Sequence, residues 1–376
     1  MILIIDASNL LAGGGIVHLR NLLQFANPQQ NDFKKIIVYG GRIPLENLLA
    51  RDWLDLREIK VLNRSFLHRL QWQQGQLEKL TKLEKGLLFV PGGLYLGKAR
   101  PLVTMFQNMQ IFENPEKSRE GISKEWLRLH LLQLGQAQTF RNSAGLIFIS
   151  NYSQNYLQQF YPNVLNRTQI CMIPHGITQT GQSKKEYKFN DTTIRVLYVS
   201  TVKQYKHQWN LIEAVAALRQ QGFPLELHLI GSSDLAALKR MKESVQKHQE
   251  LGEFIQYHGG LTHSATLKWY AEADLFAFPS SCETFGISLL EAMAAGLPTA
   301  CSNRGPMSEI LRDAGVYFNP EQPASIAEAL KRLLLDEELR QTLGSKALSI
   351  SKSYNWERTA KDTFSFLQSV NQQYLS

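Results

Sequence analysis

The stretch that decides the fold reads Ala277-Phe-Pro-Ser-Ser-Cys-Glu-Thr-Phe-Gly-Ile-Ser-Leu-Leu-Glu-Ala-Met-Ala-Ala-Gly-Leu-Pro-Thr-Ala-Cys301. It begins in a short apolar run, 274–279, that Pro279 closes. Helical spacing starts near Gly286, and the apolar residues of one face are Ile287, Leu290, Met293 and Ala294. Gly296 and Pro298 then end the helix before a second apolar run. This order predicts part of a parallel sheet, with the helix starting past the carboxyl end of a strand, where ligands bind.

The start of this predicted helix has the properties of an anion site. Its first backbone amides, around 285–288, have no partner within the helix, and together with the helix dipole they favour a phosphate. Glu283 lies in the loop before the helix, and Glu291 lies inside it, roughly 7–8 Å further along the axis. Carboxylates accept hydrogen bonds from sugar hydroxyls on either side of a phosphate. The stretch therefore predicts a site for a nucleotide-diphosphate sugar.

Length and composition limit the class of protein. The 376 residues suit two domains better than one core. No apolar run approaches the roughly 18–20 residues of a membrane helix, and the opening Met1-Ile-Leu-Ile-Ile is expected to be a strand and not a signal peptide. Three widely spaced cysteines indicate a reducing cytoplasm and argue against a zinc site. The net charge of +8 indicates an anionic partner, which can be a nucleic acid, an acidic membrane or a phosphorylated substrate.

Strand and helix patterns alternate along the whole chain, which predicts an α/β fold with parallel sheets covered by helices. In the first half the predicted strands are 2–5, 35–39, 58–62, 87–90, 102–105 and 146–149, with helices near 66–81 and 123–141. In the second half the predicted strands include 194–200, 225–230 and 254–257, and the helices include 208–220, 264–273 and 324–335.

A domain boundary is predicted near residue 175. Ile173-Pro-His-Gly-Ile is followed by the polar stretch 178–191, and such a change marks a linker. We therefore expect a first domain at 1–175, a second at 176–353 and a final helix at 354–376 that packs back on the first domain.

Two stretches of the first half are open to more than one interpretation. Residues 64–80 place apolar residues among bases and glutamines, and residues 87–100 mix glycines, apolar residues and cations. Either can contact a lipid headgroup region. The alternatives are a core-facing amphipathic helix for the first and an ordinary loop for the second.

Further charged and glycine-rich loops fall on the same predicted sheet edge as Glu283. Lys203 and Lys206 follow the strand that ends at Ser200, where a lysine can neutralise a diphosphate and stabilise it as it departs. Gly259-Gly260-Leu261-Thr262 follows another strand and can carry a nucleobase. This edge therefore has parts for both ends of a nucleotide.

The ordered set of these motifs resembles the retaining glycosyltransferases of family four. Glu283-x7-Glu291 matches the family's E-x7-E motif, Val199-Ser-Thr-Val-Lys-Gln-Tyr-Lys matches its donor-diphosphate loop, and Ile173-Pro-His-Gly-Ile matches its hinge. The resemblance spans most of the chain and is strongest over 194–320. It implies the GT-B fold, in which two doubly wound Rossmann-like domains face each other across a cleft.

The resemblance also implies roles for individual residues. Glu283 is expected to bind the donor sugar, Glu291 the ribose, and Lys206 the leaving diphosphate. The amides of Phe285, Gly286 and Ile287 are expected to hold the diphosphate, with the glycine loop Gly13, Gly14 and Gly15 approaching the donor phosphate and the acceptor.

Two positions depart from the family pattern. Thr201 stands where the family often has an arginine, and we hypothesise that Lys203 or Arg304 supplies the missing cation. Gln107 stands where the family often has a histidine near the reacting sugar. A glutamine can bond a sugar hydroxyl but cannot act as a general base at neutral pH. The retaining chemistry needs charge stabilisation more than a side-chain base, so Gln107 remains a candidate at the reaction centre.

The sequence thus predicts a retaining glycosyltransferase that takes a UDP- or GDP-sugar and a saccharide or lipid-linked acceptor, with no cofactor or metal. It is expected in the cytoplasm, and an anionic membrane surface is a further expected partner. A nucleotide-sugar epimerase or hydrolase of the same fold, or a non-catalytic subunit that binds nucleotide sugars, are the alternatives. No nucleic-acid-binding motif is present, so a nucleic acid is not expected as partner.

Overall fold

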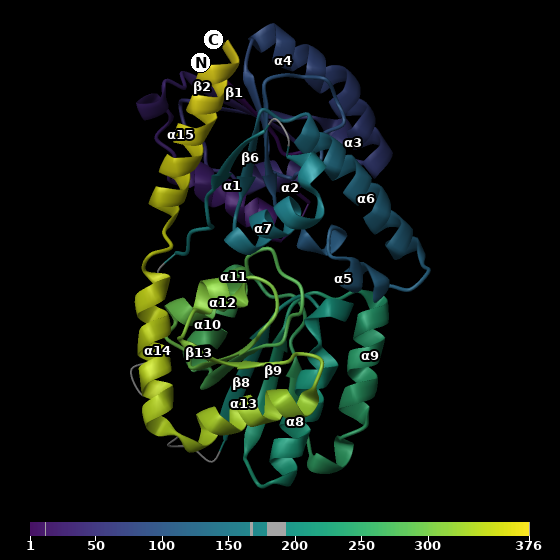
Figure 1. The fold of residues 1–376 in the computed structure, drawn as a ribbon, viewed down its shortest axis with the longest axis vertical. Helices are drawn as coiled ribbons and strands as arrows, with labels where there is room; N and C mark the ends of the chain where they lie inside the picture. Colours follow the sequence, from purple (N-terminus) through teal and green to yellow (C-terminus); the bar gives the residue numbers. More distant parts are fainter. Residues whose placement is uncertain (12, 166–167, 179–192, 376) are drawn as a thin grey trace. The chain divides into compact units, whose positions relative to one another are not determined.

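The computed structural model describes residues 1–11, 13–165, 168–178 and 193–375 (Figure 1). The chain forms two compact units. The first contains 1–117, 121–176 and 354–376, and the second contains 118–120 and 177–353. The predicted divisions after residues 175 and 353 lie beside these boundaries; the short segment 118–120 was not expected in the second unit.

The first unit is built on a sheet of seven parallel strands in the order β3-β2-β1-β4-β5-β6-β7. Their bounds are β1 Ile2–Asp6, β2 Lys35–Gly40, β3 Leu54–Glu58, β4 Leu87–Val90, β5 Leu102–Phe106, β6 Gly145–Phe148 and β7 Gln169–Met172. The predicted strand at 58–62 is wrong: β3 ends at Glu58, and Lys60–Asn63 form a 3₁₀ turn. The central strands are buried on both faces, as parallel strands covered by helices must be.

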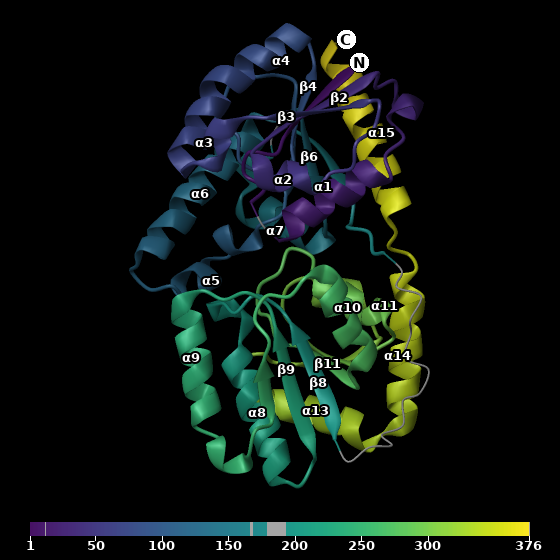
Figure 2. The same ribbon diagram turned by 180° about the vertical axis from the view of Figure 1, so that it is seen from behind.

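Helices cover both faces of this sheet (Figures 1 and 2). They are α1 Gly14–Gln24, α2 Arg42–Glu46, α3 Phe66–Trp72, α4 Glu78–Glu84, α5 Asn114–Ser118, α6 Lys124–Arg141, α7 Asn151–Phe160 and α15 Trp356–Leu375. The predicted helix at 66–81 continues from α3 to α4 through one π-helical segment, Gln73–Leu77. The last helix, α15, packs on the first unit, where the Phe364 ring lies 5.6 Å from that of Phe33.

The second unit has six parallel strands in the order β10-β9-β8-β11-β12-β13. They are β8 Ile194–Val199, β9 Leu225–Ile230, β10 Ile255–Tyr257, β11 Leu275–Phe278, β12 Thr299–Ser302 and β13 Gly315–Phe318. The helices are α8 Gln208–Gln220, α9 Leu235–Gln246, α10 His263–Glu272, α11 Ile287–Ala294, α12 Met307–Leu311, α13 Pro323–Leu335 and α14 Glu337–Ser351. Helices α8 and α13 pack against each other over the sheet.

The strand order of the second unit reverses between β8 and β11, which are neighbours although about 75 residues separate them. The connections leaving these two strands run to opposite sides, so a crevice is expected at their carboxyl ends. The loops predicted to hold the donor, 200–207 and 279–286, leave the sheet at this switch point.

Among the described residues, no helix has both the length and the apolar composition needed to cross a bilayer.

Candidate active site

The loops that follow β8 and β11 are bound to each other at Tyr205. The Ser281 backbone amide donates to the Tyr205 carbonyl over 2.9 Å, and the Ser281 hydroxyl donates to the same oxygen over 3.2 Å. Burial, followed by the nearby charge of Glu283, raises the pKa of the Tyr205 phenol well above its usual value. These contacts bring the lysine loop and the glutamate loop together, although the two lie more than 70 residues apart in the sequence.

Lys206 and Glu283 form an ion pair at this junction. Their side chains are only 10% and 16% exposed, so the pair is largely removed from water. The Lys206 ammonium also lies 5.0 Å from the centre of the Tyr205 ring, and the Lys206 carbonyl accepts from the Tyr198 hydroxyl over 3.0 Å. The predicted diphosphate cation and the predicted sugar-binding carboxylate are therefore direct neighbours.

Helix α11 begins immediately beyond Glu283. Its N-cap, Gly286, has φ 97°, a left-handed conformation that glycine adopts without the strain of a side chain. The first backbone hydrogen bond of α11 runs from the Leu290 amide to the Gly286 carbonyl. The amides before Leu290, including that of Ile287, therefore have no acceptor inside the helix. Phe285 is buried beside them. An anion next to the Lys206–Glu283 pair would thus meet both a cation and a helix N-terminus.

Glu291 lies one turn inside α11 and is held by two side chains of α10. Its Oε1 lies 3.0 Å from His263 Nε2, and its Oε2 accepts from the Tyr270 hydroxyl over 2.9 Å. Tyr270 is fully buried, and burial together with the Glu291 charge raises the pKa of its phenol. Because each carboxylate oxygen has two lone pairs, Glu291 can still accept hydrogen bonds from a diol such as a ribose.

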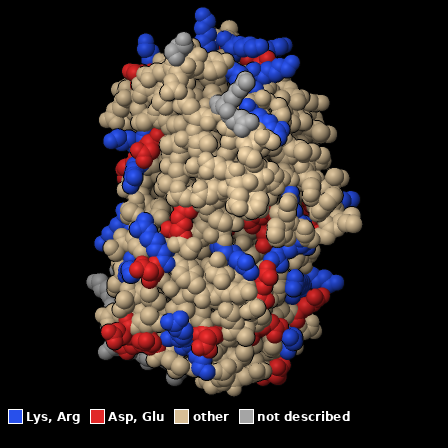
Figure 3. All heavy atoms as spheres, viewed as in Figure 1, with Lys and Arg blue, Asp and Glu red and all other residues tan. Residues whose placement is uncertain are grey.

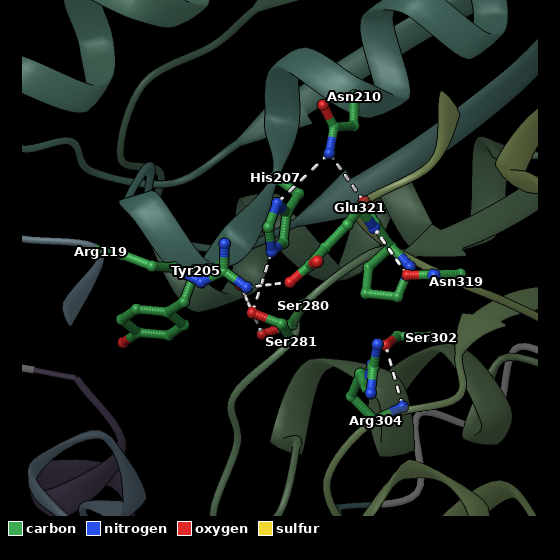
Figure 4. A network of polar contacts seen from close by, with 11 residues as sticks. Arg119, Tyr205, His207, Asn210, Ser280, Ser281, Ser302, Arg304, Asn319 and Glu321 are labelled. Atoms are coloured by element: carbon green, nitrogen blue, oxygen red, sulfur yellow. Dashed lines mark hydrogen bonds and ion pairs between the residues drawn. The ribbon is translucent and has the colours of Figure 1, made fainter. Parts of the chain in front are cut away.

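A polar network supports the lysine loop (Figure 4). His207 Nε2 lies 2.9 Å from the Ser281 hydroxyl, and Asn210 donates to the Pro320 carbonyl over 2.8 Å. An ion pair between Arg119 and Glu321 closes the network. Burial, followed by the charge of Arg119, lowers the pKa of His207 to about 4, so this imidazole is neutral at pH 7. The network fixes the backbone that carries Lys206.

The other donor-site residues predicted from the sequence lie on the same edge of the second unit. The Thr201 carbonyl accepts from Gln208 over 3.1 Å, and Lys203 is the N-cap of the short 3₁₀ turn that contains Lys206. Gly260 follows β10 and packs beside Ser232, which lies in the loop after β9. Arg304 is exposed, and its backbone amide donates to Ser302 over 3.2 Å (Figure 4). Thr201 and Lys203 thus follow β8, Gly260 follows β10 and Arg304 follows β12, so three strands of the second sheet carry these residues at their carboxyl ends.

The predicted residues of the first unit form a second, separate group. Gly13 is the N-cap of α1 with φ 68°, and α1 itself begins at Gly14. A Cβ on Gly15 would lie 2.9 Å from Leu10 and 4.0 Å from the Gln107 amide oxygen. Gln107 donates to the Pro91 carbonyl over 3.1 Å. The structure thus brings Gly15 and Gln107 together at the carboxyl edge of the first sheet.

Several residues of the junction have no signal in the sequence. Tyr205, Ser281, His263 and Tyr270 orient Lys206, Glu283 and Glu291, but each contact joins segments 21 to 76 residues apart. Within the described parts of the chain, no group of three or more histidine, cysteine, aspartate or glutamate residues is arranged to hold a metal ion.

Known proteins share this architecture. The sucrose-phosphate synthase of Thermosynechococcus elongatus superposes with a TM-score of 0.77 at 17% identity, over 100% of this chain and 99% of that chain. The fold is therefore GT-B, two Rossmann-like domains in one chain. The family model "Glycosyl transferases group 1" matches residues 179–349, which lie in the second unit.

Two curated relatives extend the comparison. The D-inositol 3-phosphate glycosyltransferase of Paenarthrobacter aurescens is 26% identical over 175 residues, which are 46% of this chain and 43% of the relative. The O-antigen chain mannosyltransferase B of Escherichia coli is 27% identical over 273 residues, 69% of this chain and 68% of the relative. The chain thus matches less than half of the first relative's length and about two thirds of the second's.

Proposed function

We propose that the chain is a retaining glycosyltransferase that moves a sugar from a UDP- or GDP-sugar to a saccharide or lipid-linked saccharide acceptor of a surface polysaccharide or glycolipid. The observation that carries the proposal is the Lys206–Glu283 pair beside the start of α11, at the switch point of the second sheet. The match of the second unit to the family model and the similarity to the two named relatives, both glycosyltransferases, support it.

In this proposal each group of the junction acts on one part of the donor. The Lys206 ammonium and the first amides of α11 neutralise the diphosphate, and their effect grows as negative charge develops on the leaving group. Glu283 accepts hydrogen bonds from the sugar hydroxyls, and Glu291 accepts them from the ribose. Lys206 and Glu283 neutralise each other before the donor binds. Donor binding exchanges this contact for one between Lys206 and the diphosphate, and the first amides of α11 offset the negative charge that the diphosphate adds.

The acceptor's proton passes to the departing phosphate oxygen as the new glycosidic bond forms on the same face of the sugar. Such a step needs no side-chain base, which is compatible with Gln107 at the edge of the first sheet. Lys206 and the helix amides supply the charge stabilisation that a metal ion gives in other transferases, so we propose metal-independent turnover. We also propose that the chain works in the cytoplasm, at the surface of an anionic membrane.

The test is transfer of radiolabelled sugar from UDP- and GDP-sugars to saccharide acceptors, with released nucleotide measured in parallel. Lys206→Ala is expected to lower turnover about 10²- to 10³-fold, as for other groups that stabilise developing charge. Lys331→Ala, at a half-buried lysine of α13 bonded to Gln221, is the control and should leave turnover unchanged.

The alternatives give different results in the same assay. Nucleotide release or donor isomerisation that needs no acceptor would indicate a hydrolase or an epimerase. Full activity of a partner complex that contains Glu283→Ala would indicate a non-catalytic binding subunit. Absence of transfer with every donor and acceptor pair, despite tight donor binding, would also contradict the proposal.

A further inference from the structure

A groove of about 650 Å³ runs between α3 and α6 in the first unit. Helices α3 and α6 lie side by side in both ribbon views (Figures 1 and 2). Its apolar lining includes Phe66, Leu70, Leu94, Leu127, Leu131 and Leu132. Leu94 approaches α6 closely because Gly135 has no side chain: a Cβ there would lie 2.8 Å from the Leu94 methyl. The volume lies within the range of sites that hold organic ligands.

The apolar residues along this groove are exposed in a continuous row. On α6, Leu127 and Leu131 line the groove and are 53% and 60% exposed, and Leu134, which is 68% exposed, continues the same helical spacing beyond the lining. On α3, Phe66 is 42% exposed. Single exposed leucines are common, but a row of them along one groove marks a binding surface. Figure 3 shows that residues other than Lys, Arg, Asp and Glu cover most of the first unit's face in that view.

All charged residues that line the groove are basic: Arg69, Lys124 and Arg128. Lys124 and Arg128 belong to the first turns of α6, whereas Leu131, Leu132 and Gly135 follow further along the helix. From Lys124 to Gly135 the helix extends roughly 16 Å. The groove therefore suits a ligand with an anionic end and a long apolar remainder.

Hydrogen bonds connect the groove to the carboxyl edge of the first sheet. Arg69 donates from Nε to the Asn9 side chain over 3.3 Å, and Asn9 follows β1. The Leu94 carbonyl accepts from Gln73 over 3.1 Å, and Leu94 follows β4. The loops after β1 and β4 are also those that contact Gly15 and Gln107, through Leu10 and Pro91. A headgroup held near Arg69 would thus reach the predicted acceptor end of this unit.

We propose that this groove binds one phosphate-bearing lipid, with its hydrocarbon chain between α3 and α6 and its phosphate near Arg69, Lys124 and Arg128. The proposal rests on the proposed function, because it assigns the acceptor to the lipid-linked class. Arg128 is paired with Glu125 on the same helix, but Arg69 and Lys124 add two further cations to the lining, which therefore favours an anionic occupant. The exposed leucines favour an aliphatic one.

The experiment uses the full chain and a photoreactive probe, dodecyl phosphate with a diazirine in its alkyl chain, kept below its micelle concentration. After irradiation, labelled peptides are mapped. Label is expected in 66–70 and 127–135, and the corresponding diazirine dodecanol should label these peptides at least fivefold less. Leu131→Glu should reduce labelling at least tenfold. Leu83→Glu, at a leucine of α4 that is 77% exposed and outside the groove, should leave it unchanged.

The outcomes separate this proposal from the proposed function. UDP and GDP binding, measured by thermal shift on the same variants, shows that Leu131→Glu is folded. Transfer to a soluble saccharide together with uniform labelling would overturn the groove and leave the transferase proposal intact. Specific labelling of the groove without any sugar transfer would support the lipid site and contradict the transferase proposal. A concentration-dependent dimer that Leu131→Glu abolishes, without specific label, would identify a second copy as the occupant and overturn the lipid.

Discussion

Removing one partner of the Lys206–Glu283 pair should cost much more than removing both. The two side chains are largely buried, and breaking a fully buried ion pair costs about 3–5 kcal/mol because it leaves a charge without a partner. Since each side chain keeps some exposure, we expect a cost of about 2–3 kcal/mol for Lys206→Met or Glu283→Gln. The double variant has no unpaired charge, and its cost should be lower than the sum by about 2 kcal/mol.

Native-state amide hydrogen exchange in β8 and β11 measures this cost, because it reports the stability of the second unit by itself. The control is Lys346→Met, which removes an exposed ion pair with Asp313 and should cost about 0–1 kcal/mol. Two results would refute the reasoning that the pair is a coupled unit. In one, the double variant loses as much stability as the two single variants together; in the other, the single variants lose no more stability than Lys346→Met.

Three further predictions follow from backbone, burial and hydrogen bonding. Gly286→Ala should destabilise the chain by about 1–2 kcal/mol because of its positive φ, while Gly75→Ala, with open space around it, should not; thermal unfolding compares the two. Burial lowers the pKa of His175 to about 4, so the unfolded chain binds more protons between about pH 6.5 and 4, and stability falls as the pH drops. The loss of unfolding free energy amounts to about 2 kcal/mol at pH 5. His175→Phe should remove this loss, and urea midpoints measured at pH 7 and pH 5 on both chains test it. Tyr270→Phe removes a bond to Glu291 and should weaken nucleotide binding about tenfold in calorimetry, whereas an unchanged affinity would show that this bond does not orient the ribose site.

The elements predicted best are those with long periodic patterns. The predicted helix 208–220 and strand 225–230 coincide with α8 and β9. Strands β3 and β7 were not predicted, and both are edge strands of the first sheet. An edge strand pairs on one side only and is partly exposed, so its sequence, such as Leu-Asp-Leu-Arg-Glu in β3, lacks a continuous apolar run. The apolar residues at 58–62, which predicted a strand, belong mainly to the 3₁₀ turn that follows β3.

The candidate site shows a similar division. Glu283, Glu291 and Lys206 could be named as candidates because the spacing of a motif is visible in the sequence itself. Their partners were not, because the Tyr205–Ser281 and Tyr270–Glu291 contacts depend on how β8, β11 and α10 pack. A tyrosine next to a lysine is an ordinary dipeptide, and only the fold makes Tyr205 the link between the two loops. The same holds for the α3–α6 groove, which combines two segments about 60 residues apart.

The central claim is that Lys206, Glu283 and the start of α11 hold a nucleotide diphosphate. Calorimetric titration of UDP and GDP, and of uridine and guanosine, into the wild type and Lys206→Ala tests it directly. We predict that at least one diphosphate binds, that its nucleoside binds at least a hundredfold more weakly, and that Lys206→Ala loses about tenfold or more of the diphosphate affinity. Equal affinities for diphosphate and nucleoside, or a Lys206→Ala variant that binds as tightly as the wild type, would contradict it.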